Sequence, residues 1–127
     1  FSEPETCALK DLTEFYLFEG SISYHSSGEE IYWQFNQCKE EKDRDLQIAK
    51  KISKETTYNL LPEEEVNLGN GYKDWFIENY KKPALTMEVS PYVGERKVPQ
   101  KYYPQIFQQN KNVPIIFAKE ILNNSLN

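Results

Sequence analysis

The chain is short and acidic, with 127 residues, 39% hydrophobic residues and a formal net charge of −5 at pH 7. This length suits one domain, 1–127, with a modest hydrophobic core. The negative charge argues against general affinity for nucleic acid or anionic membranes, and no apolar run reaches the roughly 20 residues of a membrane-spanning helix. Two cysteines are too few for a disulfide framework and do not identify a compartment.

The beginning of the chain predicts a short helix. Ser2 and Glu5 have the spacing of a Ser-x-x-Glu capping box, which would start that helix. Apolar residues then recur at helical spacing and predict a single buried stripe. The stripe would consist of Leu9, Leu12 and either Phe15 or Tyr16.

Strands and helices then alternate. Residues 17–24 end in a strand pattern, and residues 31–35 (IYWQF) favour a second strand. After a polar loop over 36–43, an amphipathic helix is predicted for 43–54 and a third strand for 56–61.

The second half continues this alternation. A helix is predicted over 72–80, and the apolar run 84–89 suits a central strand of a sheet flanked by helices. After the loop 92–100, apolar residues predict helical packing that Pro114 would kink or divide in two. The pattern predicts an α/β sandwich.

His25 is the one histidine of the chain, and it follows a predicted strand. Ligands in α/β sheets gather outside the carboxyl ends of strands, so this position favours a functional imidazole. A hydrogen-bonded structural histidine is the alternative. A catalytic zinc takes three protein ligands and a water, and no Cys-x-x-Cys or His-x-x-Glu pair accompanies His25.

Glu88 stands inside the apolar strand LTMEV, residues 85–89. A carboxylate there is costly unless it is paired, bound to metal or placed at a cavity edge. One interpretation is a buried ion pair with Lys73 or Arg96. The other is a metallohydrolase general base, for which partial burial would raise the pKa toward neutrality.

Residues 71–76 (GYKDWF) join a turn to a helix start. The free backbone N–H groups of the first turn, with Lys73, could receive a carboxylate. A solvated lysine is the alternative. Asp74 is interpreted as structural, because an acid at a helix start favours the helix dipole.

Taken together, four segments resemble the C-terminal half of the zinc carboxypeptidase family of metallopeptidases, and most of all the bacterial γ-D-glutamyl-meso-diaminopimelate peptidases that cut cell-wall peptides. They occur in the family's order and span most of the chain. The segments are FSEPET (1–6), YHSSGEEIYW (24–33), GYKDWFI (71–77) and LTMEV (85–89).

The resemblance implies a zinc peptidase acting on peptidoglycan-derived peptides, with His25 as the third zinc ligand and Glu88 as the catalytic base and acid. It places Ser26 beside the substrate backbone. It places Tyr72 and Lys73 in the substrate pocket, where the lysine would favour a substrate carboxylate such as that of diaminopimelate.

Two departures from the family matter. The first two zinc ligands, a His-x-x-Glu pair, would precede Phe1, as would the arginines that hold substrate carboxylates. Residues 66–68 also stand where the family has a mobile tyrosine, and Asn70 replaces a glycine. We therefore expect the C-terminal part of a larger catalytic domain, inactive and weak in zinc binding alone.

A partial sandwich of about four strands, from a family sheet of about eight, would leave an edge and apolar faces uncovered, so the isolated chain is expected to self-associate. A non-catalytic module that binds peptides or carboxylates on the same fold is a competing hypothesis. A third is an α/β domain in which His25 and Glu88 are structural. The compartment, bacterial cytoplasm or cell wall, stays open.

Overall fold

A four-stranded mixed sheet organises the protein, in a computed structural model that describes residues 2–62 and 71–125. The strand order is β1-β4-β2-β3, with β1 parallel to β4, β4 antiparallel to β2, and β2 parallel to β3. The strands are β1 (Ser21–Ser26), β2 (Glu30–Tyr32), β3 (Asn59–Leu60) and β4 (Ala84–Val89). A partial α/β sandwich with a mixed sheet is thus confirmed. The departure noted at 66–68 and Asn70 lies outside the described residues.

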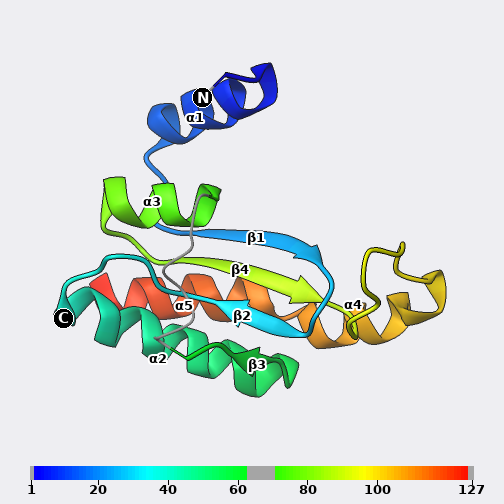
Figure 1. Ribbon diagram of the computed structural model, residues 1–127. Helices are drawn as coiled ribbons and strands as arrows, with labels where there is room; N and C mark the ends of the chain where they lie inside the picture. The colour runs from blue at the N-terminus through cyan, green and yellow to red at the C-terminus, as the bar shows by residue number, and fades with distance from the viewer. Residues whose placement is uncertain (1, 63–70, 126–127) are drawn as a thin grey trace.

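Helices cover both faces of this sheet (Figure 1). Helices α2 (Lys39–Thr56) and α5 (Val113–Ser125) lie on one face and contact each other. Helix α3 (Tyr72–Tyr80) packs on β1 and β4 from the other face, which we call the α3 face. No helix of the described part is both long and apolar enough to cross a bilayer.

The remaining helices flank these layers. Helix α1 (Pro4–Tyr16) projects beyond α3, and a 3-10 helix, η2 (Gln100–Tyr102), leads into α4 (Tyr103–Asn110) at the end of the sheet where β4 finishes (Figure 1). Pro114 lies in the first turn of α5, where its missing N–H is harmless. The chain therefore forms two helices around this proline, one of the two expected outcomes.

Alternation along β4 separates two apolar clusters. Leu85 and Met87 are fully buried in the larger cluster, together with Ile48 and Ile52 of α2. Ala84 points to the opposite face and packs with buried residues of α3. Because successive strand residues point to opposite faces, both faces of β4 are covered at its beginning. The predicted central position of 84–89 in the sheet is confirmed, as is the helix at 72–80.

Several predicted boundaries were wrong. The strand predicted within 17–24 begins at Ser21, and the strand at 31–35 is Glu30–Tyr32. Helix α2 begins at Lys39 rather than at 43, because charged residues are good helix formers and the Glu41 carboxylate accepts a bond from the Cys38 N–H at 3.1 Å. The third strand is reduced to Asn59–Leu60, because α2 extends to Thr56.

The predictions for α1 were wrong in two respects. Glu3 rather than Ser2 is the N-cap, with Pro4 in the first turn, and the Ser2 hydroxyl bonds the Glu3 side chain. The predicted stripe is exposed, because α1 does not lie on the sheet. A hydrogen bond between Thr13 and Tyr72, 2.7 Å long, is one link between α1 and α3. The exposed stripe residues are Leu9, Leu12, Phe15 and Tyr16.

The core assignment predicts a contrast between two matched substitutions. Ile52→Ala, in the buried cluster, should lower the free energy of unfolding by about 2–5 kcal/mol, because it removes apolar contacts and leaves a cavity. Ile115→Ala, on the exposed side of α5, should change it by about 0.5 kcal/mol or less. Urea unfolding of both variants measures this. Equal losses would show that α2 does not supply the core.

We also propose that the isolated chain self-associates. Among the strands that the structure describes, β1 pairs only with β4, so its other edge is an open sheet edge, and α1 exposes apolar side chains. Sedimentation equilibrium should give an apparent mass above 15.0 kDa that rises with concentration. A monomer at high concentration would contradict this proposal.

Candidate functional site

The register of three strands aligns His25, Glu88 and Glu30 in one row across the sheet. His25 on β1 is paired with Glu88 on β4, and Glu88 is paired with Glu30 on β2. Side chains of paired residues project from the same face. Because Met87 points into the core beneath α2, the row projects from the opposite α3 face.

A cavity of about 430 Å³ opens on the α3 face at the end of this row. Helix α3 covers the beginning of β4, where Phe76 and Ile77 pack with Ala84. Glu88 lies four residues further along the strand, and it lines the cavity. Other cavity walls come from the β1–β2 connection, from β2 and from the loop after β4; they include Ser26, Ser27, Glu30, Tyr32 and Glu95.

Hydrogen bonds hold two of these walls together. The Gly28 N–H donates to the carbonyl of the buried Ser90 at 3.0 Å, and the Val93 N–H donates to the Ser27 hydroxyl at 3.0 Å. The connection after β1 and the loop after β4 are therefore joined at the mouth of the cavity. Ser26, the last residue of β1, is exposed and lines the cavity; it follows His25 in the sequence.

The His25 and Glu88 side chains meet beside the cavity, which Glu88 lines and His25 does not. His25 Nδ1 lies 3.8 Å from Glu88 Oε1, and the two side chains are 59% and 19% exposed. Burial raises the pKa of the Glu88 carboxyl, His25 lowers it by a smaller amount, and Glu30 raises it further. An accessible imidazole beside a partly buried carboxylate suits proton transfer at this position.

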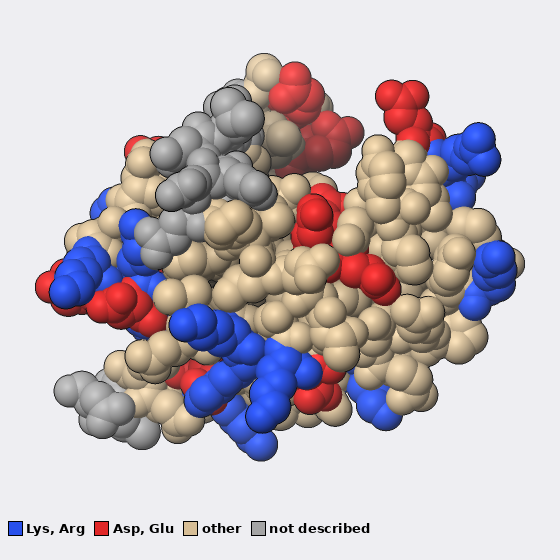
Figure 2. Space-filling model, turned by 60° about the horizontal axis from the view of Figure 1, so that its bottom comes forward, with Lys and Arg blue, Asp and Glu red and all other residues tan. Residues whose placement is uncertain are grey.

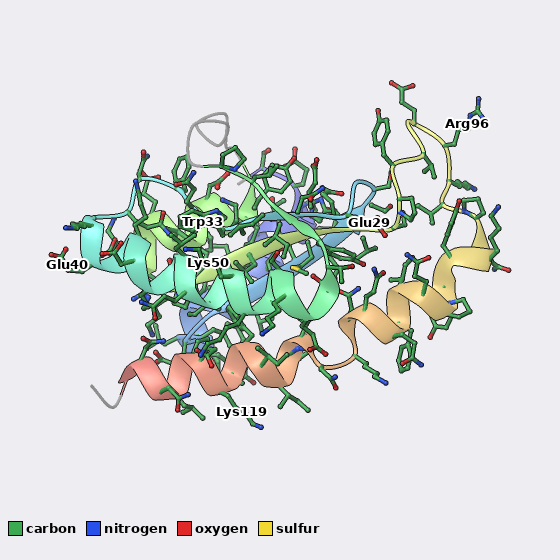
Figure 3. The ribbon with its side chains drawn as sticks, turned by 90° about the horizontal axis from the view of Figure 1, so that it is seen from below. Glu29, Trp33, Glu40, Lys50, Arg96 and Lys119 are labelled. Atoms are coloured by element: carbon green, nitrogen blue, oxygen red, sulfur yellow. The ribbon has the colours of Figure 1, made fainter. Side chains whose placement is uncertain are left out.

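The cavity is acidic. Glu30, Glu88 and Glu95 all line it, and its described lining residues include no lysine or arginine. Figure 2 shows acidic side chains in the hollow between the body of the molecule and the lobe at its right. Arg96, one of the ion-pair partners considered for Glu88, lies at the outer end of its loop and points away from the sheet (Figure 3).

Lys73 is not part of this cavity. It is 5% exposed; its ammonium donates to the carbonyl of Gln34 at 2.8 Å and forms an ion pair with Asp74. Burial lowers the pKa of Lys73, while Asp74 raises it by a smaller amount. Gln34 lies two residues after Tyr32, the last residue of β2. Because β2 runs antiparallel to β4, this position is near the beginning of β4 and away from Glu88. Lys73 is therefore neither Glu88's partner nor solvated.

Tyr72 and Asp74 also have contacts within the fold. The Tyr72 hydroxyl bonds Thr13 of α1, and its ring packs against Trp75 and Phe76. The Asp74 carboxylate accepts a long bond of 3.4 Å from the Gly71 N–H at the start of α3, which agrees with its structural interpretation. Of the predicted site residues, the structure brings together His25, Ser26 and Glu88, but not Tyr72 and Lys73.

Sequence reasoning missed Glu30 as a site residue. The sequence GEEIYW did contain a pattern that places Glu30. Ile31 is apolar and faces the core, so Glu30 and Tyr32 on either side of it share the opposite face of the strand. Glu30 joins the site only because β2 pairs antiparallel with β4, and the sequence alone does not show that pairing. Glu95, on a loop, carried no such signal.

The residues present provide only part of a zinc site. The His25 imidazole is a suitable ligand, and Glu88 beside it is a suitable neighbour for zinc-bound water. Over the described ranges, however, no three His, Cys, Asp or Glu side chains form a group that could hold a metal ion. Any zinc site here needs further ligands from outside these residues.

Comparison with known proteins finds similarity to a γ-D-glutamyl-L-diamino acid endopeptidase. The chain is 30% identical over 108 residues to γ-D-glutamyl-L-diamino acid endopeptidase 1 of Lysinibacillus sphaericus, covering 85% of this chain and 26% of that protein. It is 23% identical over 112 residues to the uncharacterised protein YqgT of Bacillus subtilis (strain 168), covering 88% of this chain and 29% of that protein. The chain thus spans about a quarter of the length of these relatives. No family model matches it.

The Lys73 contacts predict a large effect on stability. Lys73→Met should lower the free energy of unfolding by about 3–5 kcal/mol, because it leaves the buried Asp74 carboxylate without its cation. Lys82→Met removes an exposed ion pair with Glu19 and should cost about 1 kcal/mol or less. Urea unfolding compares them. Similar small losses would contradict a structural role for Lys73.

Proposed function

We propose that this chain is the C-terminal part of the catalytic domain of a zinc peptidase that hydrolyses an amide bond in cell-wall peptides. The observation that carries the proposal is the contact of His25 and Glu88 at the edge of a cavity. The similarity to an endopeptidase of γ-D-glutamyl-L-diamino acid peptides supports the same reaction class. The zinc carboxypeptidase assignment still depends on the sequence resemblance.

His25 is proposed as one zinc ligand, with the remaining ligands supplied by sequence outside this chain. Its side chain is accessible at the end of an edge strand, where another part of a larger domain could approach. When bound, the zinc would polarise the scissile carbonyl and lower the pKa of a water molecule. Neutral imidazole is a common ligand for such a metal.

Glu88 is proposed as the general base and acid. Its carboxylate accepts a proton from the attacking water as the new carbon–oxygen bond forms. It then donates that proton to the amide nitrogen as the carbon–nitrogen bond breaks, releasing an amine and a carboxylic acid, which loses its remaining proton to solvent. Its position at the cavity edge permits both steps, and the burial that raises its pKa makes the carboxylate a stronger base than a fully solvated one.

Ser26 is the other predicted site residue that this proposal retains. It lines the cavity beside His25, within reach of a substrate backbone that lies along the mouth. Tyr72 and Lys73 are not assigned a substrate role, because their polar groups bond Thr13, Gln34 and Asp74 within the fold.

A non-catalytic binding module is the second candidate. The observation that favours it is that the described residues present one imidazole and no group of three metal ligands, although the cavity is formed. Such a module would hold a peptide in the cavity without cleaving it.

The test uses the full-length natural protein with a γ-D-glutamyl-L-lysine peptide as substrate. His25→Ala should lose bound zinc, measured by atomic absorption, and activity. Glu88→Gln should retain zinc and lose about 10²–10⁴-fold in kcat, the usual contribution of a general base. Glu29→Gln, an acid outside the cavity lining, is the matched control and should behave as wild type.

The outcomes separate the candidates. Full activity and zinc content in His25→Ala would refute the peptidase proposal. A wild-type protein that binds the peptide in calorimetry but releases no lysine would support the binding module instead.

A further inference from the structure

We propose that Glu30 is a specificity-determining residue that binds the side-chain ammonium group of a diamino acid next to the scissile amide. This inference rests on the proposed function and adds the substrate group that the cavity selects. It concerns a residue that neither the sequence resemblance nor the pairing of His25 with Glu88 assigns.

Glu30 is held beside the proposed general base by the register of the sheet. It is the direct partner of Glu88 across β2 and β4, and its side chain lines the same cavity. The Tyr32 hydroxyl lies 3.5 Å from Glu30 Oε2, a long hydrogen bond from two residues further along the same face. A Cβ atom on Gly28 would lie 3.3 Å from the same oxygen, so the glycine leaves room for the carboxylate at the cavity wall.

The charges around Glu30 favour a cationic ligand group. Glu88 and Glu95 line the same cavity, and among the described residues no lysine, arginine or histidine forms an ion pair with Glu30 or Glu95. Like charges in a partly enclosed space raise one another's energy, and a ligand cation would relieve that repulsion.

The geometry favours an organic ammonium over a metal ion. The cavity carboxylates do not converge into a group that could hold a metal, which holds for all the residues that the structure describes. Tyr32 and Tyr92 also line the cavity, and tyrosine rings pack against alkyl chains and attract cations. An alkyl chain ending in an ammonium group matches both features.

A diamino acid has this chemistry. One of its amines is in the scissile amide, while the other stays free as an ammonium at the end of the side chain. The resemblance places Lys73 in the pocket and so predicts a preference for a substrate carboxylate. Glu30 would instead give a preference for a substrate ammonium, because Lys73 is buried elsewhere and the described cavity lining carries carboxylates.

Two substrates that differ in one group test the inference in the full-length natural protein. The γ-D-glutamyl-L-lysine and γ-D-glutamyl-L-norleucine peptides share the scissile amide and an unbranched side chain, and norleucine lacks the ammonium. Wild-type kcat/KM should favour the lysine peptide by about tenfold or more, the usual range for a charge-assisted hydrogen bond. Glu30→Gln should reduce this ratio to near one, and Glu29→Gln should preserve it.

The ratio separates recognition from catalysis, since a change in the acidity of Glu88 affects both substrates alike. A wild-type ratio near one, or a ratio that Glu30→Gln leaves unchanged, overturns the inference while the peptidase proposal stands. If the wild type hydrolyses neither peptide, the proposed function fails and this inference fails with it. The wild-type ratio needs no variant, so misfolding of Glu30→Gln does not prevent a decision.

Discussion

The site depends on the register of β1, β4 and β2. Side chains alternate between the faces of a sheet, so a slip of one residue in either pairing would turn His25 or Glu30 into the opposite layer. The apolar residues of the strands prevent such a slip, because Met87 and Ile31 are fully buried beneath α2 and α5. The core on one face therefore determines which polar groups meet on the other.

Helix α3 covers only part of its face of the sheet, and the uncovered part leaves the aligned polar residues open to a cavity. Helix α3 seals the beginning of β4 with apolar side chains, and its buried Lys73–Asp74 pair and bond to Gln34 join it to the segment after β2. Further along the strand, two loops joined by hydrogen bonds replace the helix and leave a cavity over Glu88. A carboxylate in the middle of an apolar strand is tolerated there because it reaches the cavity edge.

Much of the fold followed from local pattern. The helix at 72–80 and the strand at 84–89 were predicted with their observed bounds, because lysines and a proline separate them sharply. Local pattern did not predict which strands pair, or which elements pack against the apolar faces of the helices. Helix α1 has an apolar stripe that the described residues do not cover, and periodicity identifies such a face without showing what packs on it.

The candidate site was predictable to the same degree. His25 and Glu88 stood out because each is a polar group at the end of, or inside, an apolar strand. Glu30 did not, since its role depends on a nonlocal pairing. The burial of Lys73 against Gln34 and Asp74 was not predictable either, because a lysine at a helix start is ordinarily exposed. The chain covers about a quarter of the endopeptidase to which it is similar, so the proposed zinc site would take its other ligands from sequence outside the chain.

The most direct measurement is anomalous X-ray diffraction at the zinc edge from crystals of the full-length natural protein. The account predicts a zinc peak about 2.0–2.1 Å from an imidazole nitrogen of His25, on the α3 face, with the Glu88 carboxylate beside it. A zinc peak away from His25, or crystals in which His25 and Glu88 project from opposite faces of the sheet, would contradict it.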